Sequence, residues 1–223
     1  MDARHVAPLL LIGASGLAVE VAECARLLGR EVVGCLEDDP GLAGATRPGG
    51  LKVLGTTDAI GTIDALSQDD ETQIVVCVGL GSARRRVVER LVDGGVEPRR
   101  FASLVHPAAV VPAGADVGPG TVLLAGVVVT APITIGAHVV AMPHVTLTHD
   151  DVVEDYVTLA AGVSLGGGVR VGAEAYLGMN SSVLPNVKVG AGSTLGMGAV
   201  LLTDLPPGET WAGVPAARLD DAG

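Results

Sequence analysis

Hydrophobic residues follow two different patterns along this chain, and the change comes near Phe101. After it, every sixth residue is aliphatic without a break in phase. A helix cannot produce this period, because six residues turn through about 600° and leave any one face. A simple strand would alternate with a period of two. A strict period of six is typical of a parallel β-helix built from hexapeptide repeats. The series runs Val105, Val111, Val117, Leu123, Val129, Ile135, Ala141, Leu147, Val153, Leu159, Leu165, Val171, Leu177, Val183, Val189, Leu195 and Leu201.

The repeat predicts roughly five coils of about eighteen residues, each with three sides. Because the phase is unbroken, no long loop interrupts the coils, and any chemical groups must lie on the corners. We expect the many glycines to serve tight corners, where positive φ favours them. A tail with the turn Pro206-Pro207-Gly208 leaves the repeat and is expected to cap the last coil. Glycine directly follows the aliphatic residue at positions 118, 136, 166, 172, 178, 190 and 196.

Before Phe101, apolar runs alternate with segments of helical spacing, which predicts a parallel α/β sheet with right-handed crossovers. We therefore expect two domains, an α/β Rossmann-like domain over residues 1–100 and an all-β helix with a C-terminal cap over residues 101–219. The expected strands are 8–12, 31–36, 51–54 and 73–78, and the expected helices are 17–28, 57–66 and 83–94.

Composition agrees with this division. Hydrophobic residues make up 48% of the chain but aromatic residues only 2%, which suits a coil interior too narrow for rings. The formal net charge of −11 argues against a nucleic-acid partner, because phosphate binding needs a clustered basic surface. The three cysteines are an odd number and show no paired spacing, so they indicate neither a disulfide framework nor a zinc site. We expect a cytoplasmic protein without a membrane span, since no cleavable leader or long apolar segment stands out.

The repeat, the closing Gly213-Val214-Pro215-Ala216 and the short Gly13-Ala14-Ser15-Gly16 turn together resemble one known family. These are the hexapeptide-repeat sugar acyltransferases of the sialic-acid O-acetyltransferase and bacillosamine-pathway N-acetyltransferase type. The resemblance covers nearly the full length. It implies a left-handed parallel β-helix, a homotrimer, acetyl-CoA as cosubstrate and a nucleotide-linked sugar as acceptor. Whether a sugar amine or a hydroxyl receives the acyl group stays open.

His149 is the candidate general base. It stands in Thr148-His149-Asp150 at an expected corner between two sides of a coil. Acyl transfer from a thioester needs a group that takes a proton from the nucleophile, and histidine suits that near neutral pH. Relatives carry His followed by Glu or Asp at this place, so the resemblance implies His149 as base and Asp150 as its supporting carboxylate.

The N-terminal turn is the candidate substrate site. A glycine-rich turn between strand and helix can bring backbone N–H groups against a phosphate, although a tight turn explains the glycines equally well. In the resembling family this domain holds the nucleotide-linked sugar. Leu17 stands where relatives often have a histidine that helps to build the sugar site. The expected substrate-binding residues are Gly13, Ser15, Gly16, Asp38, Asp39 and Gly79.

Acetyl-CoA binds along the groove between neighbouring helices in relatives, against coil backbone. Met179 and Met197 are eighteen residues apart and should stack on one face, although packing between subunits would also suit methionine. Thr158 replaces a histidine that some relatives have near the cofactor. The cofactor-binding residues implied by the resemblance are Thr158, Gly178, Met179, Gly196 and Met197.

Two other function classes stay open. γ-Class carbonic anhydrases share this helix and bind zinc through two histidines spaced five apart, as His144 and His149 are. A third ligand is missing at the matching position, which is Ala108, and we expect no metal site. The third class is a non-catalytic trimeric protein that binds a nucleotide sugar or acyl-CoA. Of the remaining histidines, His138 is expected to be a solvated corner residue, and Arg84 to Arg86 a solvated helix start.

Overall fold

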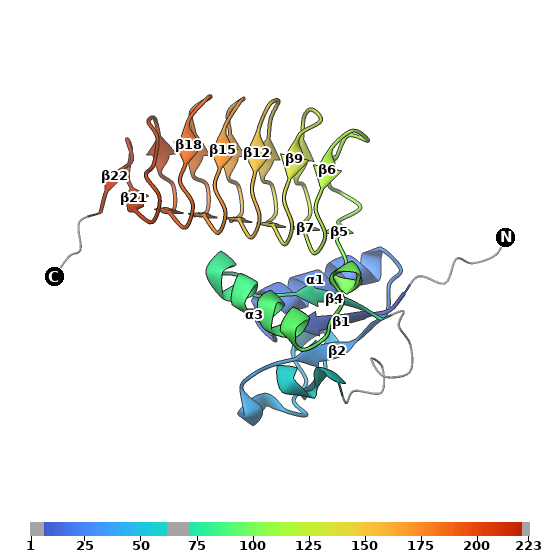
Figure 1. The fold of residues 1–223 in the computed structure, drawn as a ribbon. Helices are drawn as coiled ribbons and strands as arrows, with labels where there is room; N and C mark the ends of the chain where they lie inside the picture. The colour runs from blue at the N-terminus through green and yellow to red at the C-terminus, as the bar shows by residue number, and fades with distance from the viewer. Residues whose placement is uncertain (1–6, 62–71, 220–223) are drawn as a thin grey trace.

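The computed structural model describes residues 7–61 and 72–219, and these form an α/β half packed against a coil half (Figure 1). The α/β half holds a parallel sheet in the order β3-β2-β1-β4. Its strands are β1 (Leu9–Ile12), β2 (Val32–Leu36), β3 (Val53–Gly55) and β4 (Gln73–Val76). Its helices are α1 (Gly16–Leu27), α3 (Gly81–Asp93) and the 3-10 helices η1 (Pro40–Leu42), η2 (Pro48–Gly50), η3 (Thr57–Gly61) and η4 (Pro98–Arg100).

Strand β1 is buried on both faces. Leu9 and Leu11 pack in the cluster that includes α1, while Leu10 and Ile12 pack in the cluster that includes α3. A strand covered by a helix on each face reads as a continuous apolar run. This explains the unbroken run from Leu9 to Ile12.

The predicted α/β elements are confirmed in type and order, with ends that differ by one or two residues. The exception is the helix predicted over 57–66. Residues Thr57–Gly61 form a 3-10 helix, and residues 62–66 lie outside the described part of the chain.

The coil half is a left-handed β-helix with three sides, each a stack of parallel two-residue strands. Side 1 holds β5 (Leu104–Val105), β7 (Val122–Leu123), β10 (Val140–Ala141), β13 (Thr158–Leu159), β16 (Tyr176–Leu177) and β19 (Thr194–Leu195). Side 2 holds β8 (Val128–Val129), β11 (Thr146–Leu147), β14 (Ser164–Leu165), β17 (Ser182–Val183) and β20 (Val200–Leu201). Side 3 holds β6 (Asp116–Val117), β9 (Thr134–Ile135), β12 (Val152–Val153), β15 (Arg170–Val171) and β18 (Lys188–Val189).

The six-residue aliphatic series is confirmed as the core of this prism. From Leu123 to Leu201 its members are buried and form one cluster, and Val105, Val111 and Val117 pack against it at the first coils. Each is the second residue of its strand where a strand is formed, so it points inward. Consecutive coils pair in register, for example Val140 with Thr158 and Ala141 with Leu159.

Side 1 faces the α/β half. The first residue of each strand on side 1 points outward, yet Val122, Val140 and Thr158 are almost fully buried. Val122 and Val140 join the apolar cluster built around α1. On sides 2 and 3 the matching residues are exposed, as Ser164 and Arg170 are, or half-buried, as Val128 and Val152 are. The α/β half therefore covers one side of the prism and leaves the other two open.

Beyond the last coil, the tail adds two strands to side 1. β21 (Thr210–Ala212) pairs parallel with β19, and β22 (Ala217–Arg218) pairs antiparallel with β21. Leu205 fills the end of the aliphatic stack and is buried. The tail thus covers an edge that would otherwise expose unpaired backbone.

Candidate active site

A cleft opens at the carboxyl ends of β1, β2 and β4. Its volume is about 170 Å³, and Gly13, Ser15, Asp38 and Gly79 line it as the sequence suggested. Crevices at this edge of a parallel sheet are where α/β domains bind ligands. Two other predicted residues lie elsewhere. Gly16 is the first residue of α1 and does not line the cleft, and Asp39 caps η1 by accepting a 2.9 Å hydrogen bond from the Gly41 N–H.

Glu37 belongs to the cleft and was missed from the sequence. Its carboxylate accepts hydrogen bonds from the Ala14 N–H at 2.7 Å and from the Asp38 N–H at 3.0 Å. The glycine-rich turn is thereby tied to the end of β2. The signal was present, because Glu37 directly follows the buried strand β2 in the acidic turn. In this arrangement Glu37 occupies the Ala14 N–H that the turn would offer to a phosphate.

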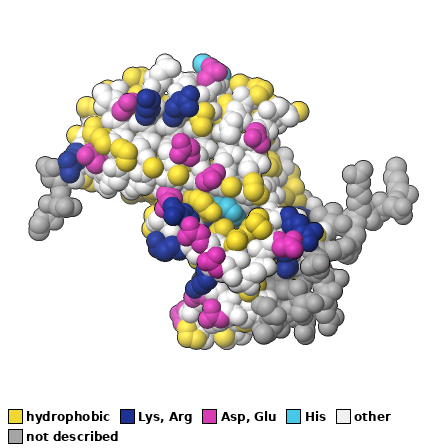
Figure 2. All heavy atoms as spheres, viewed as in Figure 1, with side chains coloured by type: hydrophobic (Ala, Val, Ile, Leu, Met, Phe, Trp, Pro, Cys, Tyr) yellow, Lys and Arg dark blue, Asp and Glu magenta, His cyan; other side chains and the backbone are white. Residues whose placement is uncertain are grey.

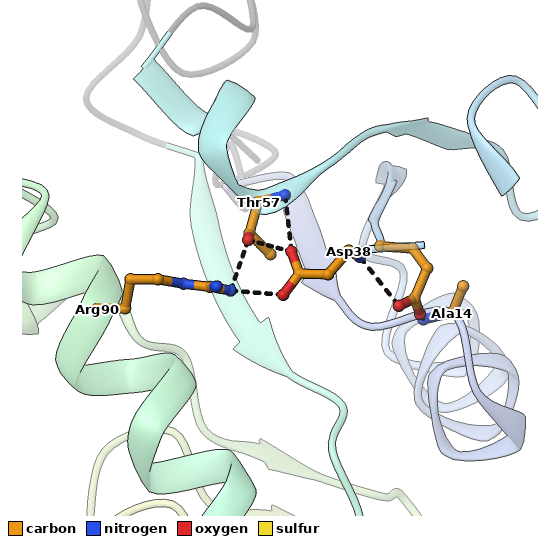
Figure 3. Close-up of polar contacts among 5 residues, drawn as sticks. Ala14, Asp38, Thr57 and Arg90 are labelled. Carbon is orange, nitrogen blue, oxygen red and sulfur yellow. Dashed lines mark hydrogen bonds and ion pairs between the residues drawn. The ribbon is translucent and has the colours of Figure 1, made fainter. Parts of the chain in front are cut away.

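Asp38 joins three elements at the cleft rim (Figure 3). Its carboxylate accepts hydrogen bonds from the Thr57 N–H and hydroxyl, and it forms a 2.7 Å ion pair with Arg90 of α3. Burial raises the pKa of Asp38, but the bonds from Thr57 and Arg90 outweigh burial and lower the pKa below its usual value. A second hollow, of about 380 Å³, is lined by Asp38, Arg86 and Arg90, and the two arginines add positive charge beside the cleft.

Arg84 ties this cleft to the coil. It is fully buried, and its guanidinium donates to the backbone oxygens of Val78 and His138 at 2.6 and 2.8 Å. It also donates to Tyr156 O at 2.8 Å and to the Thr158 hydroxyl at 3.1 Å. The expectation of a solvated Arg84 is therefore wrong. Burial lowers the pKa of Arg84 to about 10, so it stays charged near neutral pH.

Thr158 lies at the same junction, not on an open groove. The side chain is fully buried, and its hydroxyl donates a 2.6 Å hydrogen bond to the Gly79 carbonyl. This placement within the protomer gives no support to the predicted contact with acetyl-CoA. It does bring the coil into contact with the residue that closes one wall of the cleft.

His138 also lies at the junction, and the expectation of a solvated corner is wrong. Only 4% of it is exposed, since its ring stacks on Tyr156 at 5.1 Å and meets the edge of Phe101 at 4.9 Å. Burial, with a smaller contribution from Arg84, lowers the pKa of His138 to about 4. The histidine is therefore neutral near pH 7.

His149 stands on the corner between sides 2 and 3, which we call the 2–3 corner. Its Nδ1 lies 2.8 Å from Asp150 Oδ2, and the two side chains are 70% and 83% exposed. The predicted pairing of the two residues is thus present in the structure. With Nδ1 facing the carboxylate, Nε2 is the nitrogen left to face a substrate.

The imidazole ring of His149 rests on the next coil, over Gly167. A Cβ at Gly167 would lie 2.5 Å from His149 Nε2, although the backbone φ of this glycine is ordinary. The Gly168 N–H donates a 2.9 Å hydrogen bond to His149 O and joins the two coils at this point. The sequence did not point to Gly167, because His149, the residue that requires a glycine there, lies eighteen positions earlier.

The predicted cofactor methionines lie on a different corner, between sides 1 and 2. Met179 and Met197 stack there in successive coils and are 47% and 69% exposed. Gly178 and Gly196 stand beside them, where a Cβ would strike the following coil or tail. On the 2–3 corner, Leu184 and Leu202 form a second exposed apolar pair, each 47% exposed. Both corners border side 2.

The cleft and His149 lie on opposite parts of one protomer. The α/β half covers side 1 through Val122, Val140 and Thr158. The 2–3 corner is the corner of the prism opposite side 1. Within one chain, His149 therefore faces away from the cleft.

His144 lies on the corner between sides 1 and 2, so it does not share a corner with His149. Among residues 7–61 and 72–219, no three His, Cys, Asp or Glu side chains gather in a way that could hold a metal ion. Within the same ranges, no helix is long and apolar enough to cross a membrane. On the face seen in Figure 2, Lys and Arg lie interspersed with Asp and Glu, without one basic patch.

Known proteins resemble this chain in its N-terminal domain and over nearly its full length. Residues 8–91 match the family model described as the PglD N-terminal domain. The acetyltransferase domain of PglB from Neisseria gonorrhoeae is 32% identical, with 95% of this chain and 99% of that chain covered and a TM-score of 0.84.

This chain belongs to the family of hexapeptide-repeat sugar N-acetyltransferases. A mutant of perosamine N-acetyltransferase from Caulobacter crescentus, solved with CoA and GDP-perosamine, is 28% identical. That match covers 97% of this chain and 98% of the other, with a TM-score of 0.88. WeeI from Acinetobacter baumannii is 27% identical, covers 95% and 99%, and has a TM-score of 0.83.

Proposed function

We propose that this protein transfers the acetyl group of acetyl-CoA to an amino group of a nucleotide-linked sugar. The single observation that carries the proposal is the full-length match to a family whose members include an enzyme solved with CoA and GDP-perosamine. A second PglB structure was solved in complex with acetyl coenzyme A. The nitrogen acceptor is favoured over oxygen because the relative solved with CoA and GDP-perosamine is a perosamine N-acetyltransferase.

His149 would act as the general base. Asp150 holds Nδ1 at 2.8 Å, so Nε2 can take a proton from the neutral sugar amine as nitrogen attacks the thioester carbonyl. The new C–N bond forms, the C–S bond breaks, and the proton held on Nε2 passes to the leaving thiolate, so that CoA leaves as a thiol. A backbone N–H of a coil corner would stabilise the oxyanion in the tetrahedral intermediate.

The substrate site would be the cleft lined by Gly13, Ser15, Asp38 and Gly79, with Glu37 added. The cleft is small, so only part of a nucleotide sugar fits inside it, and the rest would extend toward the coil. The rim residues Arg86 and Arg90 would balance the charge of a diphosphate. We therefore assign nucleotide-sugar binding to residues 1–100 and acyl transfer to residues 101–219.

Acetyl-CoA would lie along the coils beside side 2. Exposed apolar residues occur in register on both corners of that side, namely Met179 and Met197 on one and Leu184 and Leu202 on the other. Such residues suit the pantetheine arm, and the glycines at 178 and 196 let the following coil or tail pack closely beneath them. Thr158 would serve the junction between the two halves instead.

A homotrimer would complete the site. Since His149 faces away from the cleft of its own chain, a neighbouring chain must bring a cleft to it. Closed cyclic assemblies repeat one such contact around the axis and so make every site equivalent. The two uncovered sides of the prism are the surfaces that remain for this contact.

The direct test is an acetyl-transfer assay with the purified protein. It is incubated with acetyl-CoA and, in turn, with UDP-, GDP-, dTDP- and CMP-linked amino sugars, while free thiol and product mass are followed. One of these should release CoA and gain the mass of one acetyl group. The matching hydroxyl sugars serve as controls. Binding of acetyl-CoA and a nucleotide sugar without any transfer would contradict the proposal and favour a non-catalytic protein.

A further inference from the structure

Asp151 breaks the pattern of the coil interior. In each repeat the residue two before the aliphatic one also points inward, and this position is held by Val145, Val157 and Val163 in neighbouring repeats. Asp151 is 1% exposed at this position. An ionisable side chain in an apolar stack carries a desolvation cost unless it has partners, so its presence requires a reason.

The carboxylate of Asp151 holds two backbone groups around His149. Its Oδ2 accepts a 2.7 Å hydrogen bond from the Thr148 N–H, and its Oδ1 accepts a 2.9 Å bond from the Val169 N–H in the next coil. Burial raises the pKa of Asp151, while these two N–H groups and His149 act in the opposite direction. The Asp151 side chain thus links the residue before His149 to the coil that follows.

Carboxylates also hold backbone N–H groups at other corners, but from the surface. Asp155 accepts a 2.7 Å hydrogen bond from the Ala137 N–H, and Glu154 accepts a 2.9 Å bond from the Ala173 N–H, and both contacts are exposed. Asp151 makes its two bonds from a buried position. The His149 corner is therefore held from inside the prism.

We propose that Asp151 is a positioning residue, which holds the Thr148–Asp150 corner so that the His149 ring stays over Gly167. The inference rests on the proposed function, because it assigns a positioning residue to the proposed base. Asp151 touches neither substrate nor the ring itself. It acts through the backbone on each side of His149.

The test compares Asp151→Val with a matched control. Valine is the residue that neighbouring repeats use, so the coil core stays filled. Thr121→Val is the control, because Thr121 is also fully buried and its hydroxyl accepts a 3.0 Å bond from the N–H of Val139, eighteen residues later. Asp151→Asn, of the same shape, provides a second variant if valine prevents folding.

Two readouts are needed, the steady-state rates and the ring resonance of His149 by ¹H–¹³C NMR. The resonance is identified by its absence from His149→Ala. We expect Asp151→Val to shift or broaden it, to lower kcat about 100-fold and to leave KM for acetyl-CoA within about twofold, since small misplacements of a catalytic group are costly. Asp151→Asn should lie in between, and Thr121→Val should match wild type in both.

An unchanged His149 resonance in Asp151→Val, or in Asp151→Asn if only that variant folds, would overturn the inference whatever the activity. An equal loss of kcat in Thr121→Val would also overturn it, because the effect would then be general to the coil. A displaced His149 resonance with wild-type kcat would uphold the positioning role. It would instead contradict His149 as the base, so the two failures are distinguishable.

Discussion

Glycine serves two purposes in the coil half, and the position within the repeat separates them. Glycines directly after the aliphatic residue, such as Gly172 and Gly178, have ordinary φ, but a Cβ would come within 2.6 Å of a backbone nitrogen in the next coil. Two positions later, most corners have a residue with positive φ, for example Asp150, Gly162 and Gly168. The sequence prediction of positive φ was right for the corners but not for the glycines that follow the aliphatic residue.

Gly167 serves a third purpose, because the absence of a side chain leaves room for the ring of His149. In Gly167→Ala the new methyl group would overlap the imidazole of His149 and push the ring off its place. We expect kcat to fall about 100-fold while acetyl-CoA affinity, measured by calorimetry, stays near wild type.

Gly114→Ala is the control for this substitution. Gly114 lies on another corner with ordinary φ, and its Cβ would meet only the Pro132 ring at 3.2 Å. A kcat for Gly167→Ala within threefold of wild type would show that the ring does not depend on this contact.

His138 supplies a pH dependence of stability. Burial lowers its pKa in the folded protein to about 4, against 6.5 in the unfolded chain. Between these values the unfolded state binds more protons, so folding stability falls as pH drops from 6.5 toward 4. The shift corresponds to roughly 3 kcal/mol at the acid end. Above pH 6.5 the effect vanishes.

The experiment compares unfolding free energies of wild type and His138→Asn between pH 7 and pH 4 by denaturant titration. Asparagine tolerates the positive φ of this position and does not titrate. Subtracting the two curves removes the contribution of the carboxylates. The wild-type advantage should shrink by roughly 3 kcal/mol as pH falls. A constant difference across this range would argue against a neutral, buried His138.

At the scale of elements, the junction between the two halves depends on one side chain of α3. Arg84 satisfies the backbone oxygens of Val78 in the turn after β4 and of His138 and Tyr156 on the coil corner between sides 3 and 1. Helix α3 also approaches the coil through Gly81, where a Cβ would lie 3.1 Å from the Glu174 Cα. Arg85 adds a 2.6 Å ion pair with Glu174. The helix therefore joins cleft and coil as one body.

Replacing Arg84 with methionine should destabilise the protein strongly, because several buried oxygens lose their donor. We expect a loss on the order of 4 kcal/mol in the free energy of unfolding. Arg86→Met, two residues along the same helix, should change it by less than about 0.5 kcal/mol. Chemical denaturation of both variants provides the measurement, and similar values for the two would refute the special role of Arg84.

The same elements mark the limit of prediction from sequence. The six-residue period and the alternation of strands and helices are local, so both halves could be predicted. The pairing of His149 with Asp150 is also local. Arg84 and His138 were wrongly expected to be solvated, because residues distant in the sequence cover them: coil residues surround Arg84, and Phe101 and Tyr156 pack against His138. A hydrophilic residue gives no local sign that a distant surface will cover it.

At the scale of the whole molecule, the opposite positions of cleft and base imply a site shared between chains. Mixed oligomers test this. Ser15→Trp would fill the cleft of about 170 Å³, and His149→Ala would remove the base, so each variant alone should be inactive. If every site takes its cleft from one chain and its base from another, coexpressed variants regain roughly one quarter of the wild-type activity per site. A mixture without activity would mean that each site lies within one chain.

Acetyl transfer as proposed depends on His149, and the most direct measurement is single-turnover acetyl transfer by His149→Ala. With the nucleotide-linked amino sugar that the acetyl-transfer assay selects and saturating acetyl-CoA, the transfer rate should fall by about 10²- to 10⁴-fold, as expected for loss of a general base. Acetyl-CoA affinity and the thermal midpoint should stay at their wild-type values. A transfer rate within a few fold of wild type would contradict the account.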